Sequence, residues 1–236
     1  MRSSGLIVLL LLMSSWANHF PKEPPTYSKA DLLGDINPSR HSDFEKLRSK
    51  YTSKSDAYLR EEVYNSFKKM WKAARKDGVN LLIISATRNR RYQSGIWNRK
   101  WNSFGGEEES RAERILQYSS MPGTSRHHWG TDFDLNALQN IYFESGEGQK
   151  IYQWLLTHAD EYGFYQPYIA FNGYRGEGYK EEKWHWSYYP LASKFQRAYN
   201  HLIKYGDLQG FNGQEYAQKL QVIDVYVNGV DSPPIP

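Results

Sequence analysis

Two clusters of polar residues in this chain have the types and spacing that metal chemistry needs. Within residues 125–134, His127 and Asp134 lie seven positions apart, and a second histidine, His185, follows far downstream with Glu182 three residues before it. A catalytic zinc ion commonly takes three ligands from imidazole and carboxylate groups and keeps a fourth position for water. We therefore expect His127, Asp134 and His185 to bind Zn²⁺, with His185 arriving from a neighbouring strand.

Glu182 has the position expected of a base rather than a ligand. On a strand or bend, a residue three positions before His185 can place its carboxylate near the water of a metal centre. It can then accept a proton from that water and pass it to the leaving amine. Glu181 is an alternative base. Spacing alone is weak support, because a single histidine and aspartate at this separation occur easily by chance.

Hydrophobic periodicity predicts the elements that position these groups. Apolar residues at three- and four-residue steps predict helices over 56–76 and 148–162. A buried strand over 79–85 should deliver Arg88 to its end, and a strand over 131–135 should place Asp132 and Asp134 on one face. Further elements are expected as helices over 90–101, 111–118 and 191–205, a strand over 181–188, and a helix or strand over 215–227.

Length and composition predict one compact domain with extended ends. The chain has 236 residues, of which 39% are hydrophobic and 24% charged, a globular composition. We expect a signal peptide over 1–17, a linker and lead-in over 18–50, one domain over 51–230 and a tail over 231–236. A short apolar run precedes a small-residue cleavage site at Ala17. This predicts export to the periplasm or the medium, with no membrane span after cleavage.

Charge and cysteine content exclude several classes of function. The net charge is +4, and basic residues are dispersed among acidic ones, so no nucleic-acid-binding stripe is present. There is no cysteine. Disulfides, thiolate metal sites, a cysteine nucleophile and a lipid-anchored cysteine are therefore all excluded. We expect the protein to be a monomer.

The motifs together resemble those of a known family, the VanY-type D-alanyl-D-alanine carboxypeptidases, zinc peptidases of the lysostaphin and hedgehog-like group. Residues 125–134 match S-x-H-x-x-G-x-x-x-D, and residues 182–185 match E-x-W-H. Upstream, Ser85–Arg88 with Gln93 resembles S-G-Y-R-x-x-x-x-Q, and Tyr162–Phe164 matches the Y-G-F of the family. Each piece is common alone, whereas their combination and order are specific.

The resemblance covers roughly residues 56–189 and implies a fold and a set of roles. The fold should be α+β, with a small, mainly antiparallel sheet bearing the metal and helices packed on it. His127, Asp134 and His185 would bind zinc and Glu182 would be the base. Arg88 would bind the substrate's carboxylate or the developing oxyanion. Ser125 and Gln93 would form hydrogen bonds with the substrate. A guanidinium fork suits such a role at Arg88; the alternative is a structural salt bridge.

The chain departs from the family pattern beside the metal ligands. Asp132 stands where the family usually has alanine, and Ala86-Thr87 replaces its Gly-Tyr. Our hypothesis is that Asp132 adds negative charge to the pocket and selects a substrate with a nearby amine. The alternative is that Asp132 pairs with Arg88 or Arg126. Trp184 either packs in the core and excludes water or forms a stacking wall for substrate.

The resemblance and the residues lead to one predicted function with open alternatives. We expect an exported zinc-dependent peptidase acting on peptidoglycan stem peptides, most simply a D-Ala-D-Ala carboxypeptidase. A peptidoglycan endopeptidase, an LD-carboxypeptidase and a non-catalytic wall-binding module with a structural metal are the alternatives. The sequence does not decide which bond is cleaved.

Overall fold

The computed structural model describes residues 27–172 and 175–231, which form one mixed α and β fold. The helices are α1 (Lys29–Leu33), α2 (Glu61–Lys76), α3 (Arg90–Ser103), α4 (Glu108–Leu116), α5 (Gly146–His158), α6 (Tyr189–Leu202) and α7 (Tyr216–Lys219). The strands are β1 (Phe44–Lys46), β2 (Tyr58–Arg60), β3 (Ile83–Ser85), β4 (Asp132–Leu135), β5 (Phe164–Tyr165) and β6 (His185–Tyr188).

A small antiparallel sheet forms the centre of the fold. Its strand order is β3-β4-β6-β5, and every neighbouring pair is antiparallel. Strands β1 and β2 form a separate antiparallel pair. This arrangement confirms the predicted α+β class with a small, mainly antiparallel sheet.

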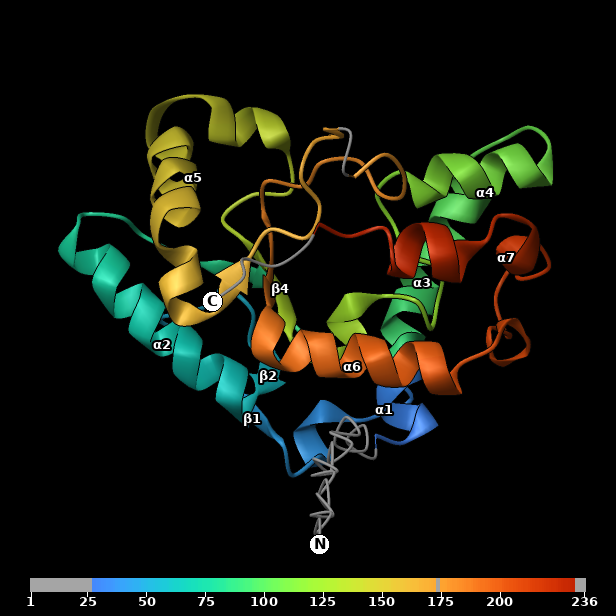
Figure 1. Cartoon of the computed structure of the whole chain (residues 1–236), viewed down its shortest axis with the longest axis horizontal. Helices are drawn as coiled ribbons and strands as arrows, with labels where there is room; N and C mark the ends of the chain where they lie inside the picture. Colours follow the sequence, from blue (N-terminus) through green and yellow to red (C-terminus); the bar gives the residue numbers. More distant parts are fainter. Residues whose placement is uncertain (1–26, 173–174, 232–236) are drawn as a thin grey trace, which may run out of the picture.

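Helices cover the sheet from two sides, and each side has its own hydrophobic core. In Figure 1, α2 and α5 lie on one side of β4, whereas α3, α4 and α7 lie on the other, and α6 runs from below β4 toward that second side. The first core joins α2 and α5 to apolar side chains of β4 and β6, including Phe133 and Trp186. The second joins α1, α3, α4 and α6 around Trp97 and Trp129. The polar residues of the predicted site lie between these two cores.

The predicted elements are present, with shifted boundaries that have local causes. Helix α2 begins at Glu61 rather than at residue 56, because residues 58–60 pair with β1. Strand β6 begins at His185 rather than at residue 181, since the carbonyl of Glu182 accepts a turn hydrogen bond from the backbone of His185 at 3.2 Å. The 215–227 segment forms α7 and a six-residue π-helix.

The N-terminal lead-in is more integrated than its sequence suggested. Leu32 of α1 is fully buried, and its carbonyl accepts a hydrogen bond from the Trp129 indole at 3.1 Å. Strand β1 pairs with β2, so no structural break marks the expected boundary at residue 51. The predicted signal peptide, the start of the linker and nearly all of the tail lie outside the described residues. No described helix has both the length and the apolar character that a membrane span requires.

Candidate metal centre and active site

The pairing of β4 with β6 brings two of the three predicted ligands together. In this antiparallel register, Asp134 lies directly opposite His185. Side chains alternate between the faces of a strand. Phe133 and Trp186 therefore enter the first core, and the polar side chains face the other way. The third ligand, His127, comes from the 3₁₀ turn Arg126–Trp129 that precedes β4.

The three side chains form a buried cluster that could hold a metal ion. One donor atom from each of His127, Asp134 and His185 lies within 4.8 Å of the others. Asp134 Oδ1 is 3.3 Å from His127 Nε2 and 3.2 Å from His185 Nδ1. Neither Asp134 Oδ1 nor His127 Nε2 has a hydrogen-bond partner among the described residues, although both are buried. Buried polar atoms normally have a partner, so the donor set fits a bound cation.

Hydrogen bonds to the far nitrogen of each ring orient the two histidines. His127 Nδ1 donates to the carbonyl oxygen of Ala86 at 2.9 Å, which leaves Nε2 facing the cluster. His185 Nε2 donates to Asp132 Oδ2 at 2.9 Å, which leaves Nδ1 facing the cluster. Such outer contacts fix the tautomer and raise the basicity of a metal-binding imidazole. Both rings therefore turn their free nitrogens toward the cluster.

Asp132 lies behind His185 and contributes nothing to the pocket surface. It is fully buried, and besides His185 its carboxylate accepts hydrogen bonds from Arg126 Nε at 2.9 Å and Ser187 Oγ at 2.9 Å. Burial alone would raise the pKa of Asp132, but the Arg126 guanidinium and the His185 contact hold it well below its usual range. The hypothesis that Asp132 selects a substrate amine is thus corrected: of the two alternatives, the structure shows the pairing with Arg126.

Glu182 lies beside the metal cluster and is nearly fully buried. Its Oε2 is 3.5 Å from His185 Nδ1. Burial raises the pKa of Glu182 to about 7, and the nearby Asp134 carboxylate also raises it. His185 and Arg88 lower this pKa, but their effect is smaller. A carboxyl group with a pKa near neutrality can both accept and return a proton.

The turn that carries Glu182 is held by an asparagine from a distant segment. Asn140 Oδ1 accepts from the backbone of Lys183 at 3.0 Å, and Asn140 Nδ2 donates to the carbonyl of Glu181 at 2.9 Å. The backbone of Glu182 itself donates to the carbonyl of Tyr168 at 2.9 Å. Sequence reasoning missed Asn140, because a single asparagine some forty residues upstream carries no recognisable pattern.

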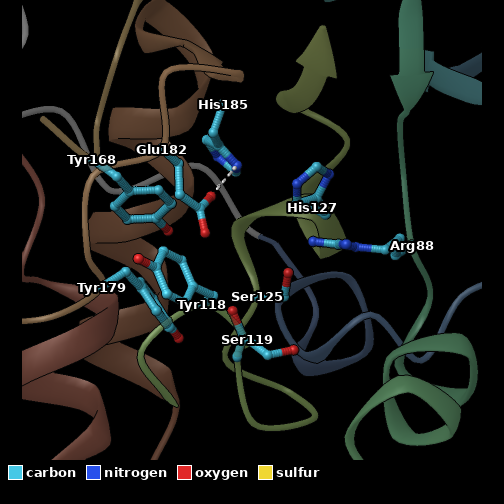
Figure 2. Close-up of a pocket in the computed structure, with 10 residues that line it drawn as sticks. Arg88, Tyr118, Ser119, Ser125, His127, Tyr168, Tyr179, Glu182 and His185 are labelled. Carbon is cyan, nitrogen blue, oxygen red and sulfur yellow. Dashed lines mark ion pairs between the residues drawn. The ribbon is translucent and has the colours of Figure 1, made fainter. Parts of the chain in front are cut away.

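Arg88 reaches the pocket from the side opposite Glu182 (Figure 2). Its Nε is buried and has no hydrogen-bond partner among the described residues, and none of their carboxylates forms an ion pair with it. Its backbone is fixed to the ligand turn, because Arg88 N donates to the His127 carbonyl at 3.2 Å. The structural salt bridge considered for Arg88 is therefore absent from the described part of the chain.

His128 holds the loop that carries Arg88 through two hydrogen bonds. Its Nδ1 donates to the Arg88 carbonyl at 2.6 Å, and its Nε2 accepts from the backbone of Gly123 at 3.1 Å. Both ring nitrogens are thus occupied away from the metal cluster, and burial lowers the pKa of His128 to about 3. This positioning role was not predicted, since only the fold brings Arg88 over His128.

Two adjoining cavities lie over the metal cluster. The smaller has a volume of about 30 Å³ and is lined by Arg88, Tyr118, Ser119, Ser120, Ser125, His127, Tyr168, Tyr179, Glu182 and His185. Figure 2 shows Ser125 entering it from below, beside the tyrosines. The larger has a volume of about 500 Å³ and includes Arg88, Asp134, Glu182 and Trp184. Both therefore share Arg88 and Glu182.

The remaining sequence-predicted site residues lie at different places. Ser125 Oγ is buried without a partner among the described residues and faces the smaller cavity. Trp184 lines the larger cavity and also packs in the first core. Gln93 lines neither cavity: it is buried in α3, where its Nε2 donates to the Ser120 carbonyl at 2.8 Å. Gln93 therefore supports the cavity wall at Ser120.

Comparisons with known proteins agree with this geometry. The family model for VanY, D-alanyl-D-alanine carboxypeptidase, matches residues 56–191, more than half of the chain. YodJ, a candidate carboxypeptidase of Bacillus subtilis (strain 168), is 29% identical over 171 residues, which are 70% of this chain and 55% of that protein. A D-alanyl-D-alanine carboxypeptidase of Enterococcus faecalis (strain ATCC 700802 / V583) is 28% identical over 122 residues, 50% of this chain and 44% of that protein.

A solved structure has a similar fold. A mutant of the vancomycin resistance D,D-pentapeptidase VanY from a VanB-type resistance cassette, in complex with Zn(II), has a TM-score of 0.52 and 22% identity, covering 77% of this chain and 92% of that chain. This chain belongs to the VanY D-alanyl-D-alanine carboxypeptidase family. It spans about half the length of the curated relatives it matches.

Proposed function

We propose that this protein is an exported, zinc-dependent peptidase that hydrolyses peptidoglycan stem peptides, as a D-Ala-D-Ala carboxypeptidase. The observation that carries the proposal is a buried Glu182 beside a cluster of His127, Asp134 and His185 with unsatisfied donor atoms. Export to the periplasm or the medium rests on the sequence of residues 1–17. The protein would act as a monomer.

The chain itself supplies the proton transfers. His127, Asp134 and His185 would hold a zinc ion, which would supply Lewis acidity for activating water and polarising a carbonyl. Glu182, with a pKa raised to about 7, accepts the proton that the attacking water loses. Glu182 then donates this proton to the departing amine, and so returns to its starting state.

Arg88 and Ser125 suit the carboxyl end of a peptide. Both line the smaller cavity, and both carry a buried polar atom without a partner in the described structure. A guanidinium binds a carboxylate through two parallel hydrogen bonds, and the Ser125 hydroxyl can donate another. A small, partly closed cavity that presents these groups suits a terminal carboxylate, which favours a carboxypeptidase over an endopeptidase.

The alternatives make different products. An endopeptidase would cut within a stem or cross-link, and an LD-carboxypeptidase would release the terminal residue of a tetrapeptide stem. A wall-binding module with a structural metal would cut nothing. The position of Glu182 argues against that last alternative, because a structural metal site needs no base.

Mass spectrometry of digested muropeptides tests the proposal. We expect loss of one alanine from pentapeptide stems with the zinc-loaded parent protein. With Glu182→Gln, a rate lower by roughly 10²–10⁴-fold is expected, since a general base contributes that much. Zinc content measured on both proteins is the control, because Glu182 is not among the ligands. Equal rates from the two proteins would show that Glu182 is not the base.

A further inference from the structure

A lysine on the wall of the larger cavity has no partner. Lys100 lies in the last turn of α3 and lines this cavity together with Arg88, Asp134 and Glu182. Its side chain is half-buried, yet its ammonium forms no hydrogen bond or ion pair with any residue in the described part of the chain. Lys183, also near the site, differs in this respect: it pairs with Glu144 at 3.3 Å.

Lys100 is only partly buried, and its Nζ is not among the fully buried atoms without a partner, but partial burial without a counter-ion is still unfavourable for an ammonium group. Desolvation lowers the pKa of Lys100, and the Arg88 guanidinium acts in the same direction, whereas Glu182 opposes both. Glu182 lies beside His185 and is part of the metal site, so it does not serve as a dedicated counter-ion. The position is thus one where an incoming anion would be favoured.

The charges that line the larger cavity also favour an anionic ligand. Arg88 and Lys100 bring two positive charges, and Asp134 and Glu182 bring two negative ones. A divalent metal ion in the cluster leaves the loaded cavity with a net charge of about +2. The terminal carboxylate of a peptide neutralises one of these charges at Arg88. One positive charge then remains, on the side of Lys100.

Each of the two cavities would hold a different part of the proposed substrate. If a terminal carboxylate binds Arg88 and Ser125 at the smaller cavity, the rest of the peptide extends into the larger one. Ile96, Leu138 and Trp184 give that cavity apolar walls, and Lys100 is its cation apart from Arg88. The first acyl residue of a D-Ala-D-Ala stem has only a methyl group. The nearest substrate position that could carry a side-chain carboxylate is the residue before it.

We propose that Lys100 binds a free carboxylate on the side chain of the second residue before the scissile bond. The protein would accordingly prefer stems whose diamino acid carries a carboxylate, such as diaminopimelate, over stems with lysine at that position. This inference rests on the proposed peptidase function and names its substrate class. Lys100 is a specificity-determining residue: it contacts the substrate away from the bond that breaks.

The test uses matched peptides and charge variants. The peptides are N-acetyl-X-D-Ala-D-Ala, in which X is diaminopimelate with its side-chain carboxylate free, the same residue with that carboxylate amidated, or lysine. We expect the zinc-loaded parent to have a kcat/KM about tenfold higher for the free carboxylate than for the amide, the size of one charge-assisted hydrogen bond. Lys100→Met should remove this difference, mostly through KM, and Lys100→Glu should favour lysine.

Arg99→Met is the matched control. Arg99 is the neighbouring residue on α3, is exposed, and does not line the cavity. Its removal changes the charge of the helix by the same amount, and the preference for the free carboxylate should persist. An equal loss of kcat/KM for all three peptides in Lys100→Met would overturn the inference, because Lys100 would then act on Glu182 or on folding.

Failure of the peptidase function is distinguishable from failure of this inference. If the parent hydrolyses none of the peptides, calorimetric binding to zinc-loaded Glu182→Gln protein still compares the free carboxylate with the amide. About tenfold tighter binding of the free carboxylate, lost in the double variant with Lys100→Met, supports the role of Lys100. Equal affinities contradict it.

Discussion

Asp132 is the residue whose role changed most between sequence and structure. The sequence suggested a role toward substrate, whereas the structure places Asp132 between His185 and the buried Arg126. A carboxylate that accepts the far N–H of a metal-binding histidine makes the imidazole a stronger ligand. The buried guanidinium compensates the carboxylate charge, which would otherwise be costly in this interior. We propose that Asp132 acts through His185 rather than on substrate.

Replacing Asp132 should therefore weaken metal binding. We expect Asp132→Asn to lower the zinc affinity by roughly 10–100-fold, because the orienting carboxylate of His185 is lost. Competition with a chromophoric chelator measures this affinity directly. Ser187→Ala is the matched control: it removes one 2.9 Å hydrogen bond to Asp132 but keeps the carboxylate. Equal affinities of Asp132→Asn and the parent would exclude the orienting role.

Variants of the Asp132 and Arg126 pair should change the stability of the fold and the zinc affinity independently. Asp132→Leu leaves Arg126 charged and buried, and we expect a loss of about 3–5 kcal/mol in the free energy of unfolding. Arg126→Met together with Asp132→Leu removes both charges and should recover most of that stability. The double variant should still bind zinc weakly. Urea denaturation and chelator competition on the three proteins test this, and recovered zinc affinity in the double variant would contradict it.

At the scale of elements, the turn from His127 to β4 depends on one glycine. Gly130 has a φ of +71°, and a Cβ there would lie 2.4 Å from the ring of Phe44 on β1. A side chain would meet both a disfavoured backbone conformation and a packed aromatic ring. The glycine of the S-x-H-x-x-G pattern thus allows the ligand turn to pack on the β1–β2 pair.

Gly130→Ala should destabilise the protein more than Gly78→Ala, because Gly78 has a similar backbone conformation but no close neighbours. Gly78 has a φ of +75°, and a Cβ there would have no neighbour within 4 Å, so Gly78→Ala isolates the backbone cost of about 1–2 kcal/mol. We expect Gly130→Ala to cost a further ~1–3 kcal/mol from the clash with Phe44. Urea midpoints of the two variants make the comparison, and equal losses would show that Phe44 moves aside freely.

The described part of the chain has two hydrophobic cores, and the candidate metal cluster lies between them. Trp129, which follows His127 closely, packs in the second core, whereas Phe133 and Trp186, next to Asp134 and His185, pack in the first. A metal held by all three ligands would therefore link the two cores. An ion that binds only the folded state also shifts the folding equilibrium by mass action.

Metal removal should accordingly lower thermal stability. We expect chelation to lower the melting temperature and zinc to restore it, with about 4 kcal/mol of stabilisation when free zinc is roughly 1,000 times its Kd. Differential scanning calorimetry of the apo and zinc-loaded proteins measures the shift. Asp134→Ala should show almost no zinc-dependent shift. A melting temperature that does not respond to zinc in the parent protein would argue against a metal at this cluster.

Much of the fold and the outline of the site could be predicted from the sequence. Periodicity located α2 and α5, because a helix that packs one face on a core needs apolar residues at regular steps. The spaced motifs singled out His127, Asp134, His185 and, as base, Glu182. The structure brings these residues together, and their catalytic roles stay proposals. Element boundaries shifted where long-range pairing, such as that of β1 with β2, competed with local propensity.

The tertiary structure alone decided what each polar residue faces. The sequence determined that a metal-type donor set and a nearby glutamate are present, because residue identity fixes which atoms can coordinate or carry a proton. It could not show that Asp132 turns toward Arg126, that His128 fastens Arg88, or that Lys100 lacks a partner among the described residues. These contacts join segments far apart in the chain, and local pattern carries no information about which distant side chain will satisfy a buried charge.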